Sequence, residues 1–263
     1  MPEYKQLVFE IRGQVAYVTL NRPESANGIQ LEICQELMDV SIRVDEDPNV
    51  RAVVLGGSGR FFSAGGDLKA FSKQGERLPA YAKEVTTFLH AAVSRFTRMD
   101  APVIGAVHGT AAGAGMSLVC SCDFVIAAAS AKFTMAYTKA GITPDGSSTY
   151  FLPRIVGLRR ALELALTNRV LSADEACAMG IVTRVVPDAE LTGAVDALAR
   201  ELAQGATRTL GMTKRLLHQS WVETLETQME LEARTVADAM RTEDCREGIA
   251  AFVAKRPAKF HGR

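Results

Sequence analysis

Two short apolar runs, each followed at once by a glycine-rich segment, constrain the fold of this chain most. Residues 52–55 (Ala-Val-Val-Leu) precede the glycine-rich residues 56–59, and residues 103–107 (Val-Ile-Gly-Ala-Val) precede the glycine-rich residues 108–115. Short apolar runs bounded by glycine are typical of buried strands. Helical patterns separate the strands, and together they predict an α/β core of recurring strand-strand-helix units.

The rest of the first 190 residues continues this alternation. Residues 7–11 and 14–20 predict a β-hairpin, and residues 124–127 and 181–186 predict two further strands. The apolar repeat predicts helices at residues 31–44, 79–99, 108–121, 159–167 and 172–179. Ser172 and Glu175 have the spacing of a capping box at the start of the last of these helices.

After Pro187 the chain becomes helical and charged. Four helices are predicted, at residues 191–204, 209–220, 223–240 and 243–253. We therefore expect an α/β core over residues 1–190 and a helical region over residues 191–263. The helical region is too thin to carry a large core of its own, which indicates that it packs against a partner subunit.

The composition excludes several classes of protein. Thirty basic and thirty acidic side chains give the 263 residues a formal net charge of zero, which leaves no footprint for nucleic acid or a membrane surface. No apolar run approaches the ~20 residues of a membrane span, and the first residues lack the layout of a signal peptide. Five cysteines without paired ligand spacing read as small buried hydrophobes in a reducing cytoplasm. We expect a cytoplasmic protein with no metal or redox cofactor.

Two glycine-rich segments have the character of loops that present backbone amides to a ligand. They are residues 61–68 (Phe-Phe-Ser-Ala-Gly-Gly-Asp-Leu) and residues 108–115 (His-Gly-Thr-Ala-Ala-Gly-Ala-Gly). Glycine lets an amide approach a ligand oxygen closely, and two converging amides make an oxyanion hole. Each segment alone is also explained as a structural turn. Neither matches a phosphate P-loop or the dinucleotide-binding fingerprint.

One carboxylate, Asp145, lies in a tight turn between a proline and a glycine, just before a helix-like run that begins near Ser147. Such a carboxylate is either a helix cap or a catalytic base. Ser147 and Ser148 are able to cap the helix, which favours the catalytic interpretation.

In combination these segments resemble the crotonase superfamily, the enoyl-CoA hydratases and isomerases. The matching segments follow the family's order and spacing across nearly the whole chain, at residues 20–24, 62–68, 102–115, 121–123, 131–133, 141–144 and 252–260. The resemblance implies a crotonase spiral of ββα units with a C-terminal helical trimerisation region, assembled as a homotrimer or a dimer of trimers. It also implies an acyl-CoA substrate and no separate cofactor, because CoA is part of the thioester.

The resemblance assigns roles to several residues by position. The backbone amides of Gly66 and Ala114 are expected to hold the thioester oxygen as it becomes enolate-like. The adenine of CoA is expected near Ala26 and Ala64.

Other substrate-binding residues are implied at the edges of these segments. Asp67 and Leu68 complete the first glycine-rich loop. Lys255 or Lys259 is expected to meet the CoA phosphates, either within the subunit or from a neighbouring one. Solvated tail lysines are the alternative interpretation.

At two positions the chain departs from the hydratase pattern. Hydratases of this family resemble one another in using two glutamates, and those positions hold Ser117 and Tyr137 here. Neither side chain is a general base near neutral pH without help. A hydration mechanism that uses a glutamate pair is therefore not expected, and Tyr137 is assigned to the acyl pocket instead.

Asp145 occupies a position where isomerases of the family carry an aspartate. One carboxylate suffices to move a proton from the carbon next to the thioester to a carbon two positions away. Burial in an apolar pocket is expected to raise the Asp145 pKa and make it a better base. Aromatic candidates for that pocket are Phe71, Phe88, Tyr137, Tyr150 and Phe151. The sequence therefore predicts an acyl-CoA isomerase.

Three alternatives remain open, and one of them is enoyl-CoA hydration without the usual glutamate pair. Aryl-CoA dehalogenases of the superfamily resemble this chain around residues 131–169 and use an aspartate at the Asp145 position as nucleophile, with a histidine at the His90 position to activate water. A helical histidine such as His90 is also explained as a packed or surface residue. The third alternative is a non-catalytic acyl-CoA-binding scaffold, since both glutamates are absent.

Overall fold

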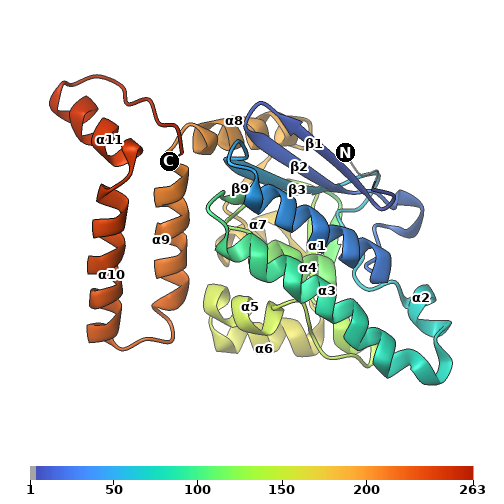
Figure 1. The fold of residues 1–263 in the computed structure, drawn as a ribbon. Helices are drawn as coiled ribbons and strands as arrows, with labels where there is room; N and C mark the ends of the chain where they lie inside the picture. Colours follow the sequence, from blue (N-terminus) through green and yellow to red (C-terminus); the bar gives the residue numbers. More distant parts are fainter. Residues whose placement is uncertain (1–3, 263) are drawn as a thin grey trace.

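A computed structural model of the chain describes residues 4–262. Its main sheet has six strands in the spatial order β1-β2-β3-β4-β6-β9 (Figure 1). These are β1 (Leu7–Arg12), β2 (Val15–Leu20), β3 (Ala52–Gly57), β4 (Val103–Val107), β6 (Phe124–Ala128) and β9 (Arg184–Val186). β1 and β2 form the predicted antiparallel hairpin, and every other neighbouring pair is parallel. The predicted α/β class is confirmed.

Helices cover both faces of this sheet, which explains why its central strands β3, β4 and β6 are continuously apolar. α1 (Leu31–Glu46) and α3 (Leu78–Arg98) pack together over one face, where Val53 and Leu55 of β3 join the larger core. Ala52 and Val54 point to the other face, against α8 (Leu191–Ala203). The helical region predicted over residues 191–263 therefore includes a helix that belongs to the packing of the sheet.

A second sheet, of three strands, is formed by segments from the middle of the sequence. It contains β5 (Thr110–Ala112), β7 (Lys132–Thr134) and β8 (Leu171–Ser172). The helix predicted from residue 108 was wrong over β5, because those residues pair with β7 and Ala111 bridges to Ser63. These partners are distant in sequence, so local periodicity does not reveal them.

The remaining elements of the core connect the two sheets. They are the helices α2 (Leu68–Ser72), α4 (Ala114–Ser121), α5 (Ser148–Val156), α6 (Leu158–Thr167) and α7 (Ala173–Ala178), and the 3₁₀ turns η1 (Pro23–Ser25), η2 (Gly75–Arg77), η3 (Tyr137–Ala140) and η4 (Asp188–Glu190). α4 is buried along its whole length. The capping box predicted for Ser172 and Glu175 is present at the start of α7.

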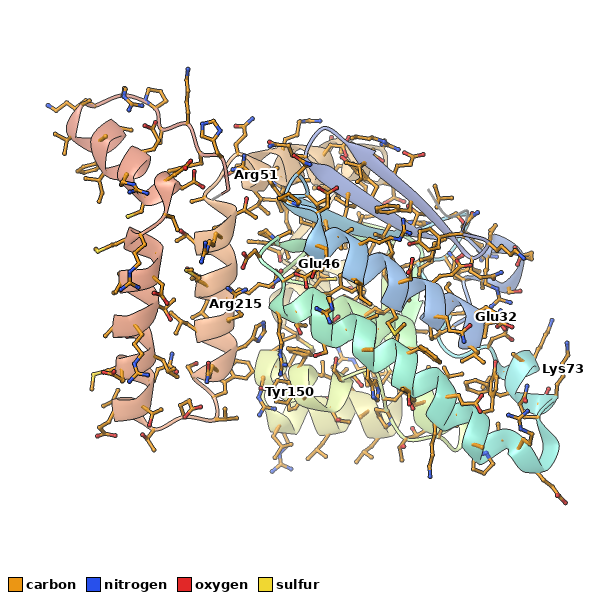
Figure 2. The ribbon with its side chains drawn as sticks, viewed as in Figure 1. Glu32, Glu46, Arg51, Lys73, Tyr150 and Arg215 are labelled. Carbon is orange, nitrogen blue, oxygen red and sulfur yellow. The ribbon has the colours of Figure 1, made fainter. Side chains whose placement is uncertain are left out.

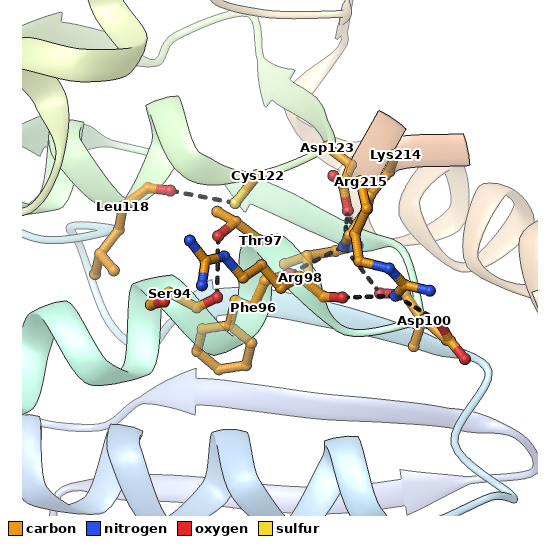
Figure 3. Close-up of polar contacts among 12 residues, drawn as sticks. Ser94, Phe96, Thr97, Arg98, Asp100, Leu118, Cys122, Asp123, Lys214 and Arg215 are labelled. Carbon is orange, nitrogen blue, oxygen red and sulfur yellow. Dashed lines mark hydrogen bonds and ion pairs between the residues drawn. The ribbon is translucent and has the colours of Figure 1, made fainter. Parts of the chain in front are cut away.

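The last three helices extend outward from the core, and the first of them still packs against it. α9 (Thr207–Gln219) is fastened to it by Lys214, whose Nζ donates to Asp123 Oδ2 at 2.8 Å and to the carbonyls of Phe96 and Ala101 (Figure 3). Both partners of this ion pair are nearly buried, with side-chain exposures of 11% and 13%. α10 (Leu225–Met240) and α11 (Glu243–Val253) project away from the sheets (Figure 1).

The chain beyond α11 folds back toward the junction of α8 and α9. The buried guanidinium of Arg51 donates to the hydroxyl of Thr207 and to the carbonyl of Phe260. The buried carboxylate of Asp244 accepts the amides of His261 and Gly262. The end of the tail is thus held by two charged side chains that bond the backbone of residues 260–262.

Over residues 4–262, none of the helices has the length and apolar character needed to cross a membrane. The same residues contain no cluster of three or more His, Cys, Asp or Glu side chains arranged to hold a metal ion.

Candidate active site

Asp145 lies in a tight turn whose shape depends on the glycine that follows it. Gly146 has φ +57°, and a Cβ added there would lie 2.9 Å from the Cβ of Ser117 on α4. Ser147 also adopts a left-handed conformation, with φ +71°. The turn therefore sits directly on α4, and the backbone that carries Asp145 is pressed against the buried helix.

The carboxylate of Asp145 is not a helix cap. α5 has Ser147 as its N-cap residue without a side-chain cap bond, while the hydroxyl of Ser148 donates to the backbone carbonyl of Asp145. The side chain of Asp145 instead accepts a hydrogen bond from Tyr137, with 2.5 Å between the Tyr137 hydroxyl and Asp145 Oδ1. The Asp145 carboxylate therefore does not cap α5, and the catalytic interpretation remains.

Ser117 extends this contact into a chain of hydrogen bonds. Its Oγ lies 2.8 Å from the hydroxyl of Tyr137. Because Tyr137 gives its one proton to Asp145, Ser117 donates in this contact. Ser117 and Tyr137, the two residues at the expected glutamate positions, therefore meet at Asp145 and both support its charged form.

Burial and hydrogen bonding act in opposite directions on this carboxylate. Burial raises the pKa of Asp145, and the Tyr137 hydrogen bond offsets part of that rise. Burial and the neighbouring Asp145 charge also raise the pKa of Tyr137, so its hydroxyl remains a donor. Asp145 is consequently a stronger base than an exposed aspartate while remaining hydrogen-bonded.

His90, on α3, approaches the same turn. Its Nε2 accepts the backbone amide of Gly146 at 3.2 Å. An amide can only donate, so the proton of the neutral imidazole is on Nδ1. His90 therefore lines the site, with its acceptor nitrogen engaged by the backbone.

The two glycine-rich loops meet beside this network. A Cβ added at Gly65 would lie 2.9 Å from the carbonyl oxygen of Ala112 and 3.2 Å from the Cα of Gly113, so both positions need the close approach that glycine allows. In the parallel bridge to Ile29, the backbone bonds are made by the residues on either side of Gly66. The amide of Gly66 therefore points away from Ile29, toward the second loop.

Ala114 completes the convergence as the first residue of α4. The first amides of a helix have no partner inside the helix, and they carry the positive end of its dipole. A Cβ added at Gly113 would lie 4.0 Å from the amide nitrogen of Gly66. The structure thus brings together the two amide positions that the sequence indicated.

Asp145 opens onto a cavity of about 800 Å³ between α3, α5 and α9. Figure 2 shows Tyr150 and Arg215, two of its lining residues, on α5 and α9. The lining residues are His90, Val93, Ser94, Thr97, Arg98, Pro144, Asp145, Ser147, Thr149, Tyr150, Phe151, Arg215, His218, Gln219 and Val222.

Two of the five aromatic residues suggested for the acyl pocket, Tyr150 and Phe151, line this cavity. Phe88 packs against the core, and the Phe71 ring lies against Gly66 and the ring of Tyr81. The α9 residues of the cavity wall were not found from the sequence, since no motif marks them and α9 reaches the site only through its packing on α3.

The remaining candidate residues of the first loop lie on the outside of the core. The amide of Ala64 donates to the carbonyl of Ala26, and Ala64 is exposed. Asp67 caps α2 by accepting the amide of Ala70 and pairs with Arg22 at 3.1 Å. Burial alone raises the pKa of Asp67, but these partners outweigh it and hold the pKa below its usual range.

Leu68 is half exposed at the first position of α2. Lys255 and Lys259 are exposed in the segment after α11. α11 and α2 lie on opposite sides of the molecule (Figure 1). Within one chain, the two lysines are therefore remote from the loop that carries Ala64 and Leu68.

Comparisons with known proteins agree with this arrangement. The family model described as enoyl-CoA hydratase/isomerase matches residues 10–263. The chain is 41% identical over 251 residues to the 1,2-epoxyphenylacetyl-CoA isomerase of Escherichia coli K12, covering 95% of each protein. It is 34% identical over 242 residues to 4-chlorobenzoyl coenzyme A dehalogenase-2 of an Arthrobacter species, covering 92% of this chain and 88% of the relative.

The fold comparison gives the same answer. The crystal structure of an enoyl-CoA hydratase from Polaromonas sp. JS666 superposes with a TM-score of 0.92 at 31% identity, covering 97% of this chain and 99% of that one. The chain belongs to the enoyl-CoA hydratase/isomerase family, within the crotonase superfamily, and has the crotonase fold. Its relatives include an isomerase, a dehalogenase and a hydratase.

Proposed function

We propose that the protein is an acyl-CoA isomerase that shifts a double bond through a thioester enolate, with Asp145 as the acid/base. The observation that carries this proposal is that Asp145 is the one carboxylate among the described residues that line the cavity, and it is both largely buried and hydrogen-bonded. The E. coli relative, named as an isomerase, supports the same reaction class.

The proposed reaction needs one proton carrier and one anion site. Asp145 removes a proton from the carbon next to the thioester, and the electron pair of the C–H bond moves toward the thioester oxygen. The amides of Gly66 and Ala114 hold that oxygen as it gains negative charge. Asp145 then returns the proton to the carbon two positions away, and the double bond ends in its new place.

The Ser117–Tyr137 pair suits this reaction better than hydration. Addition of water needs a base that holds and deprotonates the water, and both hydroxyl groups are engaged in stabilising Asp145 instead. A neutral hydroxyl is a poor base near pH 7.

Hydrolytic dehalogenation is the second candidate, because His90 lines the same cavity and the Arthrobacter relative is named as a dehalogenase. The hydrogen bond from Gly146 to His90 Nε2 weighs against it. Activation of water needs the acceptor nitrogen that this bond occupies. A non-catalytic scaffold is disfavoured by the close approach of the two loops beside a buried carboxylate.

One assay separates these candidates. A 3-enoyl-CoA and a 2-enoyl-CoA are offered to the wild type and to Asp145→Asn, and the absorbance of the conjugated thioester is followed. We expect the wild type to convert the 3-enoyl substrate and Asp145→Asn to lose at least about 10²-fold in kcat, the lower range for a proton-transfer group. The proposal fails if the two proteins are equally active or the 3-enoyl substrate is untouched. Halide release from a haloaryl-CoA would favour dehalogenation.

We further propose that the working form is a homotrimer or a dimer of trimers in the cytoplasm. α10 has no buried residue, and Leu225, Met229, Val236 and Met240 form an exposed apolar stripe along it. Exposed stripes of this kind are typical of subunit interfaces. CoA would bind along Ala26, Ala64 and Leu68, with a neighbour's tail lysines at its phosphates.

A further inference from the structure

The cavity has a reacting end at Asp145 and a distal end, and α3 runs along the wall between them. Its lining residues on α3 are His90, Val93, Ser94, Thr97 and Arg98, a single stripe at spacings of three and four. The eight residue steps from His90 to Arg98 rise by about 12 Å along the helix. His90 contacts the turn that carries Asp145, so Arg98 marks the distal end.

The distal end is positively charged. Among the described lining residues, Arg98 and Arg215 are the cations and Asp145 is the one anion. Burial lowers the pKa of His218, so this histidine is neutral at physiological pH and adds no charge. Both arginines line the part of the cavity wall that is distant from Asp145, the proposed acid/base.

Arg215 is already paired. Its Nη1 donates to Asp100 Oδ1 at 2.7 Å and to the carbonyl oxygen of Arg98 at 2.8 Å (Figure 3). The adjacent Lys214 is fastened to Asp123, which fixes this part of α9 against α3. Arg215 therefore anchors the backbone of Arg98.

The guanidinium of Arg98 is in a different situation. Figure 3 shows it extended beside Ser94 and Thr97, and the dashed line at Arg98 comes from its carbonyl oxygen. Over residues 4–262 its side chain makes no hydrogen bond or ion pair, and it lines the cavity. A guanidinium presents several donors in a plane that matches a carboxylate.

We propose that this distal end binds a carboxylate at the far terminus of the acyl group, so that Arg98 selects acyl-CoA substrates whose chain ends in a carboxylate. The inference rests on the proposed isomerase function, because it assigns the same cavity to the acyl chain. Tyr150, Phe151 and Val222 contact the middle of the chain, while Arg98 receives the charged end and Arg215 keeps Arg98 in place.

The test compares two medium-chain 3-enoyl-CoA substrates of equal length, one ending in a methyl group and one in a carboxylate. We expect the wild type to prefer the carboxylate substrate by about 10-fold or more in kcat/KM, the scale of a charge-assisted hydrogen bond. Arg98→Gln should abolish this preference, because its loss in kcat/KM falls mainly on the carboxylate substrate. Arg95→Gln is the matched control, since Arg95 lies on the same helix but pairs with Asp45 outside the cavity.

Two results would overturn the proposal: equal kcat/KM for both substrates in the wild type, or an equal loss on both substrates in Arg98→Gln. If neither substrate is isomerised, the isomerase function fails separately. Calorimetry with the two saturated acyl-CoA analogues then tests the distal site alone. Tighter binding of the carboxylate analogue to the wild type, lost in Arg98→Gln, supports the site; equal binding overturns it.

Discussion

The residue that decides the chemistry is held between two opposing effects. Burial favours the neutral form of Asp145, and the Tyr137 hydroxyl favours the charged form. A base that is too strongly stabilised by hydrogen bonds loses proton affinity, and one with no hydrogen bond is protonated at neutral pH. Tyr137, with Ser117 behind it, therefore sets the pH range in which Asp145 works.

Removing the Tyr137 hydroxyl should move that range. Tyr137→Phe removes an interaction that lowers the Asp145 pKa, so the pKa rises further. Activity requires the charged carboxylate, and the acidic limb of kcat/KM should shift to higher pH. Near neutral pH we expect a loss of about 10-fold or more. Ser117→Ala is the companion variant and should shift the limb in the same direction by less. An unchanged limb in Tyr137→Phe would contradict this role.

The opposing effects on the Asp145 charge should also make the free energy of unfolding depend on pH. The folded-state pKa of Asp145 is raised above its unfolded value, so the stability linked to its proton is present at low pH and lost as pH rises through the folded pKa. At pH 7–8 the wild type carries a buried charge that Asp145→Asn lacks. We expect Asp145→Asn to raise Tm by on the order of 2–4 °C there, with the gain vanishing below about pH 4. A gain that is independent of pH would point to a different cause.

At the scale of elements, the two glycine-rich loops depend on a close approach that side chains would prevent. At Gly65, with φ +96°, an added Cβ would lie 2.9 Å from a backbone oxygen that has no room to move. Displacement of this loop moves the amide of the next residue, Gly66, relative to Ala114. The geometry of an anion site is sensitive to such shifts.

Gly65→Ala should therefore cost activity beyond its effect on folding. We expect a loss of about 10²–10³ in kcat, the range seen when one anion-hole donor is lost. Gly13→Ala in the β1–β2 hairpin is the matched control, since Gly13 has φ +62° with no atom near the added Cβ. Circular dichroism and Tm would be measured for both. Equal kcat in Gly65→Ala and the control would show that the close approach at Gly65 does not control activity.

Elements with a strong local pattern could be predicted, and elements that depend on distant partners could not. The hairpin, α1, α3 and the capping box of α7 follow from periodicity and cap residues. β5 escapes local reasoning because its partners lie elsewhere in the chain. At the site, Asp145 was found from its turn, but the Ser117–Tyr137–Asp145 contacts and the α9 wall exist only after folding.

At the scale of the whole molecule, the exposed apolar stripe on α10 is not covered by any other part of residues 4–262. Its apolar side chains cannot be covered by the core, because α10 contacts mainly α9 and α11. Val236→Glu places a charge in that stripe, and we expect it to convert the proposed assembly to monomers. Sedimentation velocity checks this. A native mass equal to that of the wild type would argue against α10 as the interface. Ala237→Glu, which adds the same charge at an exposed position of α10 outside the stripe, is the control.

The same assembly has a consequence for the substrate site. Lys255 and Lys259 are remote from the loop of Ala64 within one chain (Figure 1), so in the proposed assembly lysines that meet the CoA phosphates would come from a neighbour. Asp145→Asn should be inactive, and the double variant Lys255→Ala/Lys259→Ala should show a KM raised by about 10-fold. Mixed assemblies of the two variants, made by co-expression, contain some sites with Asp145 from one subunit and both lysines from its neighbour. We expect activity at low substrate concentration to exceed the sum of the parent proteins. If the lysines serve their own subunit, every site keeps one defect and co-expression adds nothing, which would place the CoA phosphates within a single chain.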